Sequence, residues 1–502
     1  MCGYKVHGLN LPSGIWCNDD NILKDEVVKY FKELLSRDGE VRVGSDGDCR
    51  TRLSDDARRV LTKPISKIEV YEALMSMKSY KAPGPAGFQR IFFKMFWNDV
   101  GDDLWHLVKN AFEMGSFDVA TTDTLLVLIP KGDHPTSFTN FRPISLCNVT
   151  YKIIAKVLVT RLRPFLNDII SPLQSSFISG RSTKDNAIIL QKIIYHMNKK
   201  RKKKGDVVFK LDLEKAYDRV DWGFLKQTLI MFGFPTYIIS LIMHSLASTL
   251  ISLLWNGSKT ESFTPSCGLR QGDPLSPYLF VLCMERLGEM IQEEVRVGRW
   301  LPLQVSANGP TISHLFFVDD VLLFAKSKPS QARVINKILD DFCSISGLKV
   351  SLDKSQVFAS ASVTRRRKER ITSTTHIQFT TNLGKYLGFQ MHHGRIKKED
   401  FSTIMDKVSN KLASWKGRLL NKPGRVTLAN SVLTAIPAYS MQIQWLPQYV
   451  CDHLDKTVRS FIWKGSTNKG MHMVGWEKIN KSKKNGGSWS ENCEETKHCV
   501  TW

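Results

Sequence analysis

The chain has 502 residues, of which 42% are hydrophobic and 24% charged, and this composition excludes a wholly disordered protein. Lysine and arginine outnumber aspartate and glutamate by 71 to 48, so the formal net charge is +23. Such an excess favours a polyanionic partner, nucleic acid before an anionic membrane surface, although a merely soluble basic protein would also show it. Ten cysteines occur without any C-x-x-C spacing, and the N-terminus lacks an apolar signal region. We therefore expect an intracellular protein, nuclear or cytoplasmic and not secreted.

Hydrophobic periodicity predicts the elements of the first third of the chain. A polar extension over 1–60 contains one amphipathic helix, at 23–35. KAPGPAG at 81–87 is typical of a fixed Pro/Gly loop, and 125–129 is typical of a strand. Residues 151–166, YKIIAKVLVTRLRPFL, place apolar side chains on one face and Lys and Arg on the other, which predicts a helix.

One stretch, TYIISLIMHSLASTLISLLW at 236–255, is long enough to span a membrane. Four serines, two threonines and His244 interrupt it, and the turn residues Asn256 and Gly257 follow directly. We expect a helix running into a strand, both in a protein core, and no membrane partner.

The middle of the chain carries the strongest charge block, KKRKKKG at 199–205. A solvated loop is the favoured interpretation, with phosphate contact as the lesser alternative. The apolar run VVFKLDL at 207–213 follows it and predicts a strand.

From 396 onward, apolar side chains recur at steps of three and four, which predicts helices with a basic opposite face. The members of this stripe are Phe401, Ile404, Met405, Val408, Leu412, Trp415 and Leu419. Such a stripe is usually core packing, so a nucleic-acid role would lie on the basic face. The last residues show no periodicity and are expected to be disordered. Cys493, His498 and Cys499 lack a second ligand pair, so we expect no zinc site there.

HLFFVDDVLLF at 314–324 holds two adjacent carboxylates, Asp319 and Asp320, inside an apolar run. Two short buried strands joined at these residues would form a tight hairpin with both carboxylates at its tip. Because neighbouring negative charges repel, one must hold a proton or both need a cation, and oxygen ligands favour Mg²⁺ or Mn²⁺. Alone the pattern is weak, and an Asp-rich turn is the alternative.

A third carboxylate comes from VVFKLDLEKAYDRVDW at 207–222, where the predicted strand ends on Asp212. Three carboxylates around two Mg²⁺ ions are an arrangement used in phosphoryl transfer. Asp218 and Asp221 are rival candidates, but they follow the strand, so Asp212 is favoured. Between these segments GLRQGDPLSP introduces a long helix, and its plain interpretation is a loop and cap with Asp273 or Ser276 as the capping residue.

Taken together, these segments resemble the reverse transcriptase of a plant non-LTR retrotransposon, a long interspersed nuclear element. The matching segments are KAPGPAGF (81–88), LIPKGDHPTSFTNFRPISLCNVTYKIIAKVLVTRL (128–162), SSFISGRSTKDNAI (175–188), KLDLEKAYDRVDW (210–222), GLRQGDPLSPYLF (268–280), FFVDDVLLF (316–324), SGLKVSLDKS (346–355), KYLGFQM (385–391) and SWKGRLLNKPGRVTLANSVLTAIPAYSMQIQWLP (414–447). The resemblance covers roughly residues 20–487, and the order of the motifs makes it specific.

The resemblance implies an α+β right-hand polymerase with an antiparallel-sheet palm, fingers and a helical thumb. The expected divisions are an N-terminal extension (1–60), an N-terminal helical part of the polymerase region (61–122), the reverse transcriptase fingers and palm (123–395), a helical thumb-like region (396–465) and a disordered or aberrant C-terminus (466–502). It also implies an RNA-directed DNA polymerase that takes an RNA template, a DNA primer, dNTPs and two Mg²⁺ ions, with Mn²⁺ as an alternative.

Residue roles follow from the same resemblance. Asp212, Asp319 and Asp320 match the metal-binding triad, with Leu213 beside them in the metal site. Lys131 and Arg142 match the basic pair that grips the triphosphate, and Tyr217 matches the aromatic that stacks under the incoming sugar and excludes a 2′-hydroxyl. The remaining matches are Gln271 and Gly272 beside nucleotide and template, Lys354 as proton donor to pyrophosphate, and Leu387 and Gly388 at the primer end.

Two departures leave other functions open. Ala86 stands where the family usually has Asp, and SWSENCEETKHCVTW replaces the Gly-rich pattern that normally continues the C-terminus. No endonuclease, ribonuclease H or zinc-knuckle segment is recognised, so we expect a polymerase core cut from a larger element. The alternatives are a catalytically inactive relic that only binds RNA and, less favoured, a maturase of the group II intron kind.

Overall fold

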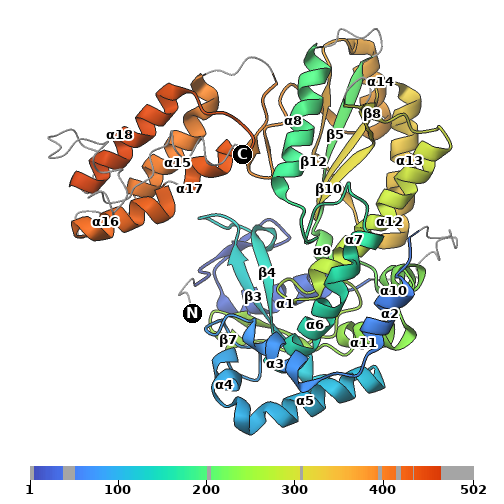
Figure 1. Cartoon of the computed structure of the whole chain (residues 1–502), viewed down its shortest axis with the longest axis vertical. Helices are drawn as coiled ribbons and strands as arrows, with labels where there is room; N and C mark the ends of the chain where they lie inside the picture. Colours follow the sequence, from blue (N-terminus) through green and yellow to red (C-terminus); the bar gives the residue numbers. More distant parts are fainter. Residues whose placement is uncertain are drawn as a thin grey trace. The chain divides into compact units, whose positions relative to one another are not determined.

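The computed structural model describes residues 5–37, 51–199, 205–305, 309–393, 398–413, 420–433 and 435–464 (Figure 1). It divides into two compact units. Unit 1 consists of the described parts of 1–182 and 203–380, and unit 2 consists of those of 183–202 and 381–502. Both units mix helices with strands, and each is described by itself.

Unit 1 contains most of the secondary structure. Its helices are α1 (Asp20–Leu34), α2 (Asp55–Thr62), α3 (Lys67–Met75), α4 (Arg90–Met95), α5 (Trp97–Met114), α6 (Val149–Leu162), α7 (Leu166–Ile169), α9 (Ala216–Arg219), α10 (Trp222–Met231), α11 (Thr236–Ala247), α12 (Ser276–Arg296), α13 (Pro329–Ser346) and α14 (Arg365–Thr375). Its strands are β1 (Leu9–Asn10), β2 (Trp16–Cys17), β3 (Thr124–Pro130), β4 (Phe141–Cys147), β5 (Asp206–Leu213), β6 (Ile251–Trp255), β7 (Ser258–Lys259), β8 (Leu303–Gln304), β9 (Thr311–Ile312), β10 (His314–Phe317), β11 (Asp320–Lys326), β12 (Val350–Ala359) and β13 (Gln378–Thr380).

A five-stranded sheet in the order β10-β11-β5-β12-β13 is the centre of unit 1. The pairs β10–β11, β11–β5 and β5–β12 are antiparallel, as the sequence predicts for the main sheet. The edge pair β12–β13 is parallel, which departs from that prediction. The reason is local, because parallel neighbours need a crossover and α14 supplies it between these two strands.

A second sheet, in the order β4-β3-β6-β7, pairs β3 with β4 antiparallel and with β6 parallel. The predicted strand at 125–129 is confirmed as β3. The segment 236–255 forms α11 followed by β6, as expected. Among the described residues no helix is long and apolar enough to cross a membrane.

The other predicted elements of unit 1 fall close to their expected positions. The helix at 23–35 is α1, the strand at 207–213 is β5, and 81–87 is a loop in which the Ala86 amide donates to Asn148 Oδ1 at 2.9 Å. The helix predicted over 151–166 is confirmed as far as Leu162, and only its last four residues depart from the prediction. α6 ends at Leu162 and a 3₁₀ turn through Pro164 follows, because proline cannot donate the next helical hydrogen bond.

Unit 2 combines one long helix, one small hairpin and a group of C-terminal helices. Its elements are α8 (Thr183–Lys199), β14 (Lys385–Tyr386), β15 (Phe389–Gln390), α15 (Ser402–Ala413), α16 (Lys422–Leu428), a π-helical turn (Ala429–Leu433), α17 (Ala435–Met441) and α18 (Gln448–Lys464). The first members of the predicted stripe pack in one core with α18, including Phe401, Val408 and Leu412. Trp415 and Leu419, residues 200–204 of the basic run, and the C-terminal residues 465–502 lie outside the described residues.

Candidate polymerase active site

The carboxylate hairpin predicted from HLFFVDDVLLF is confirmed. β10 and β11 pair from His314↔Leu323 to Phe317↔Asp320, so the turn between them consists of Val318 and Asp319. Val318 has φ 55°, in the left-handed region that a β-branched residue rarely adopts. Such a conformation costs on the order of 1–3 kcal/mol and persists only where the surroundings enforce it.

The enforcing contacts come from the segment just before α8, which the sequence interpretation did not assign a supporting role. The Val318 amide donates a hydrogen bond to Ser176 Oγ, and that hydroxyl donates to Gln174 Oε1 at 2.8 Å. Ser176 and Gln174 are both fully buried. The Ser175 amide also donates to the Phe316 carbonyl at 3.1 Å. This segment therefore fixes the turn that carries Asp319, and its sequence, QSSF at 174–177, does not reveal that role.

Asp212 lies at the same end of the sheet as the hairpin tip. Val321 of β11 pairs with Leu211 of β5, so Asp320 and Asp212 are each one residue further along, on a shared face. On the other side of β5, Asp212 pairs with Ser351 of β12. The strand register, set by the apolar runs on both strands, therefore places two of the three predicted carboxylates side by side.

The electrostatics of the three carboxylates show that they interact. Desolvation raises the pKa of Asp319, and the charge of Asp212 raises it further. Desolvation, followed by the charge of Asp319, raises the pKa of Asp320 to about 6. Lys210 partly opposes this second shift. The hairpin tip is thus a site where the fold disfavours bare negative charge, and a cation would relieve it.

Lys354 is positioned toward Asp212 by an irregularity in β12. The register of β12 against β5 shifts between Ser351 and Gln356, a β-bulge, and bulges re-aim side chains. Lys354 Nζ lies 3.7 Å from Asp212 Oδ2, with both side chains substantially exposed. The Ser355 hydroxyl within the bulge accepts the Asp212 amide at 3.1 Å.

Lys131 and Arg142 come from the β3–β4 hairpin and face the same carboxylates. Desolvation lowers the pKa of Lys131, and the charges of Lys354 and Arg142 lower it further, while those of Asp218 and Asp212 act in the opposite direction. Arg142 likewise lowers the pKa of Asp319. Lys131 Nζ donates to the Thr139 carbonyl at 2.9 Å. The structure therefore brings three predicted cations within electrostatic range of the predicted carboxylates.

Tyr217 lies half-buried at the start of α9. Its ring stacks on Phe280 of α12, with centroids 4.6 Å apart and planes at 12°. Burial raises the pKa of its hydroxyl, and the charge of Asp319 adds to this effect, so the phenol stays neutral close to the hairpin tip. This stacking holds the ring in one orientation, as the predicted exclusion of a 2′-hydroxyl would require.

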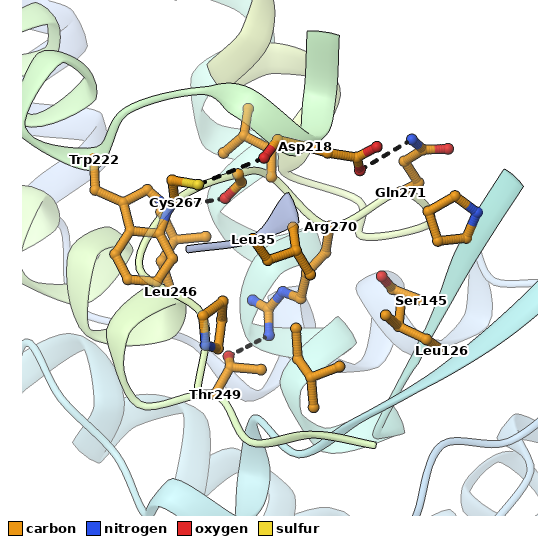
Figure 2. Close-up of a pocket in the computed structure, with 15 residues that line it drawn as sticks. Leu35, Leu126, Ser145, Asp218, Trp222, Leu246, Thr249, Cys267, Arg270 and Gln271 are labelled. Carbon is orange, nitrogen blue, oxygen red and sulfur yellow. Dashed lines mark hydrogen bonds between the residues drawn. The ribbon is translucent and has the colours of Figure 1, made fainter. Parts of the chain in front are cut away.

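The segment 267–271 is tied to α9 by a set of hydrogen bonds. Leu269 N donates to the Tyr217 carbonyl at 2.6 Å, and Gly268 N donates to the Val220 carbonyl at 2.8 Å. The Gln271 amide group donates through Nε2 to Asp218 Oδ1 at 3.4 Å (Figure 2). These hydrogen bonds hold the loop that carries Gln271 next to Tyr217, so the two predicted nucleotide-binding residues lie close together.

The two rivals of Asp212 have other partners. Asp218 is buried beside Gln271, and burial raises its pKa to about 6. Asp221 accepts the Phe224 amide at 2.8 Å as the N-cap of α10 and pairs with Arg37 Nη1 at 2.8 Å. Asp221 is thus a capping residue, which favours Asp212 for the triad.

Gly272 has a backbone reason for its place next to Gln271. Its φ is 111°, and a Cβ added there would lie 2.9 Å from the Ser145 carbonyl oxygen of β4. The Ser145 amide donates to the Gln271 carbonyl at 2.7 Å. Glycine lets this loop run against β4 and holds Gln271 near the β3–β4 hairpin.

Beneath this loop lies a buried ion pair in place of the predicted simple cap. Arg270 Nη2 lies 3.2 Å from Asp273 Oδ2, which also accepts the Tyr151 hydroxyl at 2.6 Å. Arg270 also donates to Thr249 Oγ1 at 2.9 Å (Figure 2). Asp273 Oδ1 accepts the Leu275 amide at 2.9 Å, whereas the Ser276 hydroxyl has no partner among the described residues. The adjoining cavity holds about 30 Å³. That is room for a water or two, so it excludes this cavity as a nucleotide site.

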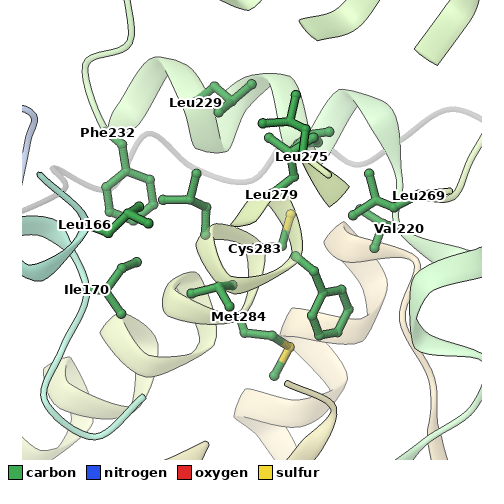
Figure 3. Packing of buried hydrophobic residues seen from close by; sticks show 14 of the residues in the cluster. Leu166, Ile170, Val220, Leu229, Phe232, Leu269, Leu275, Leu279, Cys283 and Met284 are labelled. Carbon is green, nitrogen blue, oxygen red and sulfur yellow. The ribbon is translucent and has the colours of Figure 1, made fainter. Parts of the chain in front are cut away.

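The helix that begins here, α12, anchors the site in the core of unit 1. Leu279, Cys283 and Met284 on α12 pack with side chains from α10 and from the loops on both sides (Figure 3). Phe280, the partner of Tyr217, is fully buried in the same cluster.

Leu387 and Gly388 lie in unit 2, where they form the two-residue turn between β14 and β15. Both have positive φ, 48° and 84°, as a type I′ turn requires. Tyr439 of α17 donates to the Leu387 carbonyl at 2.6 Å and stacks on Phe389 at 4.3 Å. The predicted turn is confirmed, and Tyr439 is a support that its distance in sequence concealed.

The three side chains at the hairpin tip are carboxylates, and Mg²⁺ and Mn²⁺ prefer oxygen ligands of this kind. Across the described ranges, no three His, Cys, Asp or Glu side chains are close enough together to hold a metal ion. The sheet fixes the backbone positions of Asp212 and Asp320, and both side chains are partly exposed.

Residues 129–391, more than half of the chain, match the family described as reverse transcriptase (RNA-dependent DNA polymerase). The chain belongs to this family, and its domain is that of an RNA-directed DNA polymerase. The match begins in β3 and ends just after β15, so it contains every predicted site residue.

Particular relatives come from retrotransposable elements. The chain is 25% identical over 471 residues, 92% of its length, to a protein of Xenopus laevis named transposon TX1 uncharacterized 149 kDa protein. It is 33% identical over 356 residues, 70% of its length, to the retrovirus-related Pol polyprotein from the type-2 retrotransposable element R2DM of Drosophila melanogaster. The chain spans only 35% and 31% of these two proteins. It is also 40% identical over 95 residues, 18% of its length, to 15% of a putative ribonuclease H protein of Arabidopsis thaliana.

Proposed function

We propose that this chain extends a primer 3′-hydroxyl with dNTPs on an RNA template, at the end of the five-stranded sheet that carries Asp212, Asp319 and Asp320. The single observation that carries the proposal is the convergence of these carboxylates with Lys131, Arg142 and Lys354 around one sheet end. Opposed groups of carboxylates and cations are what a nucleotidyl transfer site needs, because it must hold a triphosphate next to its metal ions.

Asp212, Asp319 and Asp320 would hold the metal, with Leu213 adjacent to them in β5. Two Mg²⁺ ions, or Mn²⁺, would there stabilise the attacking and leaving oxygens of the transfer. The strained Val318 turn and its Ser176 support keep Asp319 in place, and the β5–β11 register does the same for Asp320. This positioning is supplied by the backbone and does not depend on the substrate.

Lys131 and Arg142 would grip the triphosphate from the β3–β4 hairpin. Lys131 is already held by the Thr139 carbonyl, and its pKa is lowered by burial and then by neighbouring cations, whose charge a polyphosphate would neutralise. Lys354, 3.7 Å from Asp212, is within reach of a leaving pyrophosphate and would supply its proton.

Tyr217, fixed by Phe280, would exclude a 2′-hydroxyl and so select dNTPs. Gln271 would contact the nucleotide while Asp218 holds its amide group, and Gly272 gives the loop its close approach to β4. Leu387 and Gly388 would contact the primer end. In this proposal the five-stranded sheet is the palm, the second sheet belongs to the fingers, and the helices from α15 to α18 form the thumb of a right-hand polymerase.

We further propose a non-LTR element of a plant genome as the source, on the basis of the motif order and the similarity to an Arabidopsis protein. The partners would be an RNA template, a DNA primer and dNTPs, in the nucleus or cytoplasm. The 25% and 33% identities to proteins of retrotransposable elements support this assignment.

Primer extension on poly(rA)/oligo(dT) with dTTP and either Mg²⁺ or Mn²⁺ tests the proposal. The wild-type chain should extend the primer, and Asp319→Ala should not, while circular dichroism shows both folded. Folded wild-type protein that extends no primer with either metal would contradict the proposed activity. Equal extension by the two proteins would remove Asp319 from the site.

A further inference from the structure

The helix α14 carries an unusual concentration of positive charge. Five of its first six residues are basic, and they are Arg365, Arg366, Arg367, Lys368 and Arg370. We call these residues the α14 basic face. The only acidic residue in the helix is Glu369, which pairs with Arg365 at 2.9 Å.

The fold explains one side of α14 and leaves the other to solvent. Ile371 and Thr375, one turn apart, are buried against unit 1. Arg366 and Arg370, also one turn apart, are exposed. Within the described part of the chain these two arginines form no ion pair, so their charge is not used inside the fold.

The helix itself opposes this arrangement of charge. Its first turn holds three arginines and no acidic residue, at the end where the macrodipole is positive, and the Thr364 side chain does not cap it. Arg366 and Arg370 are like charges at i and i+4, which repel. A polyanion bound on this surface would relieve both the unfavourable interaction with the macrodipole and the repulsion between the two arginines. The packing of α14 does not require either arginine.

The α14 basic face lies away from the catalytic end of the sheet. β12 pairs Ser351 with Asp212 at one end and Ala359 with Val207 at the other, and α14 follows that second end. The Ser360 amide donates to the Asp206 carbonyl at 3.0 Å, at the start of β5. The length of β5 separates this point from Asp212 by about 20 Å. A partner on α14 is therefore not the nucleotide in the active site.

We propose that the α14 basic face is a second nucleic-acid contact, which binds the phosphate backbone of RNA outside the catalytic end. The identity of the polyanion rests on the proposed function, because RNA is the polyanion that a reverse transcriptase must retain while it copies. A membrane surface fits less well, since an interfacial helix needs an exposed apolar face and the exposed large hydrophobic side chains of the described residues include none from α14.

The double variant Arg366→Gln with Arg370→Gln tests this surface. Its matched control is Arg296→Gln with Arg299→Gln, which makes the same charge change at exposed arginines of unit 1 that pair with Glu293 and Glu294. The measurement is fluorescence anisotropy of a long single-stranded RNA over a series of KCl concentrations. Each lost phosphate contact should flatten the dependence of log K on log salt by about 0.7, so two should flatten it by about 1.4.

The α14 variant should lose RNA affinity and salt dependence, while the control keeps both. Equal affinity and slope for the two double variants would overturn the proposal. Arg366→Lys with Arg370→Lys retains the charge and should retain the slope; a loss there as well would assign the effect to the fold and also overturn it. Tighter binding of the wild type to phosphatidylserine vesicles than to RNA would favour the membrane instead.

Primer extension separates this inference from the proposed function. On a short primer–template at saturating concentration the α14 variant should extend as fast as the wild type, because the catalytic end is unchanged. If no protein extends a primer and the salt slopes still differ, the proposed activity fails and the RNA surface stands. If extension is normal and the slopes agree, only the RNA surface fails.

Discussion

Two carboxylate sites of unit 1 differ in how far the protein satisfies their charge. Asp273 is buried and accepts hydrogen bonds from Arg270, Tyr151 and the Leu275 amide. Asp319 and Asp320 lie at an accessible hairpin tip, and within the described residues neither is in an ion pair. Desolvation raises the pKa of both carboxyl groups, the charge of Asp212 raises both further, and the charge of Asp319 also raises that of Asp320.

The difference is the one expected between a structural carboxylate and the carboxylates of the proposed metal site. The partners of Asp273 complete its hydrogen bonding, so it fastens the loop before α12 and has no capacity for a ligand. At the hairpin tip the protein places like charges together on a strained turn, and the nearby cations Arg142, Lys210 and Lys354 do not cancel the raised pKa values of Asp319 and Asp320. This arrangement is what the proposed metal site requires, because an external cation would relieve the repulsion.

The largest expected effect is on catalysis at the hairpin tip. Asp320→Asn removes a proposed metal ligand and should reduce primer extension on the order of 10³-fold or more, since metal ions supply several kcal/mol of transition-state stabilisation. Thermal stability should not fall, because a neutral amide avoids the desolvation cost and the repulsion that together raise the pKa of Asp320 to about 6. Single-turnover extension and calorimetry on one preparation measure both effects. A large loss of stability would show that Asp320, like Asp273, is a structural carboxylate.

The opposite outcome is expected at the buried ion pair. Asp273→Ala leaves the Arg270 guanidinium buried without its carboxylate and should lower the free energy of unfolding by about 3–5 kcal/mol. Replacing both partners, Arg270→Met with Asp273→Leu, should recover a large part of that loss, because no uncompensated charge remains. Urea unfolding of the three proteins measures this. A double variant no more stable than Asp273→Ala would show that the charge is not the cause.

A third carboxylate, Glu285 of α12, allows a test by pH. Burial raises its pKa to about 8, and its Oε1 accepts only the Ser171 amide at 3.1 Å. Because the folded protein holds this proton more tightly than the unfolded chain, the contribution of Glu285 to stability is full below about pH 4.5. It is then lost as pH rises toward 8, by roughly 2–4 kcal/mol. Glu285→Gln stays neutral and should lose this dependence. The free energies of unfolding of the wild type and of Glu285→Gln, measured at several pH values, should therefore diverge as pH rises.

The smallest expected effect concerns the hydrogen bond between Asp218 and Gln271. Either Asp218→Ala or Gln271→Ala should raise the KM for dNTP several-fold, corresponding to about 1 kcal/mol. If Asp218 acts only by holding the Gln271 amide group, the double variant should have the same KM for dNTP as Gln271→Ala alone. Additive losses in steady-state kinetics would show that the two residues act independently.

The sequence predicts the site better than it predicts the structure that supports it. The Asp–Asp hairpin and the strand that ends on Asp212 follow from short-range patterns, because apolar runs fix strands and their register. The support of Val318 by Ser176 and that of Leu387 by Tyr439 could not be predicted, since such contacts join residues far apart in the chain. Likewise, the parallel edge strand β13 depends on how α14 packs, and the Arg270–Asp273 pair depends on Tyr151 from α6.

Metal binding by the hairpin tip is the most direct test of this account. Mn²⁺ can be titrated into the wild-type chain and into Asp212→Asn, Asp319→Asn and Asp320→Asn, with free Mn²⁺ followed by electron paramagnetic resonance. Asp206→Asn, at the far end of β5, is the matched control. The account predicts that the wild type and the control bind Mn²⁺ alike and that each of the three variants binds it much more weakly. Equal binding by all five proteins would contradict the assignment of Asp212, Asp319 and Asp320 as the metal site.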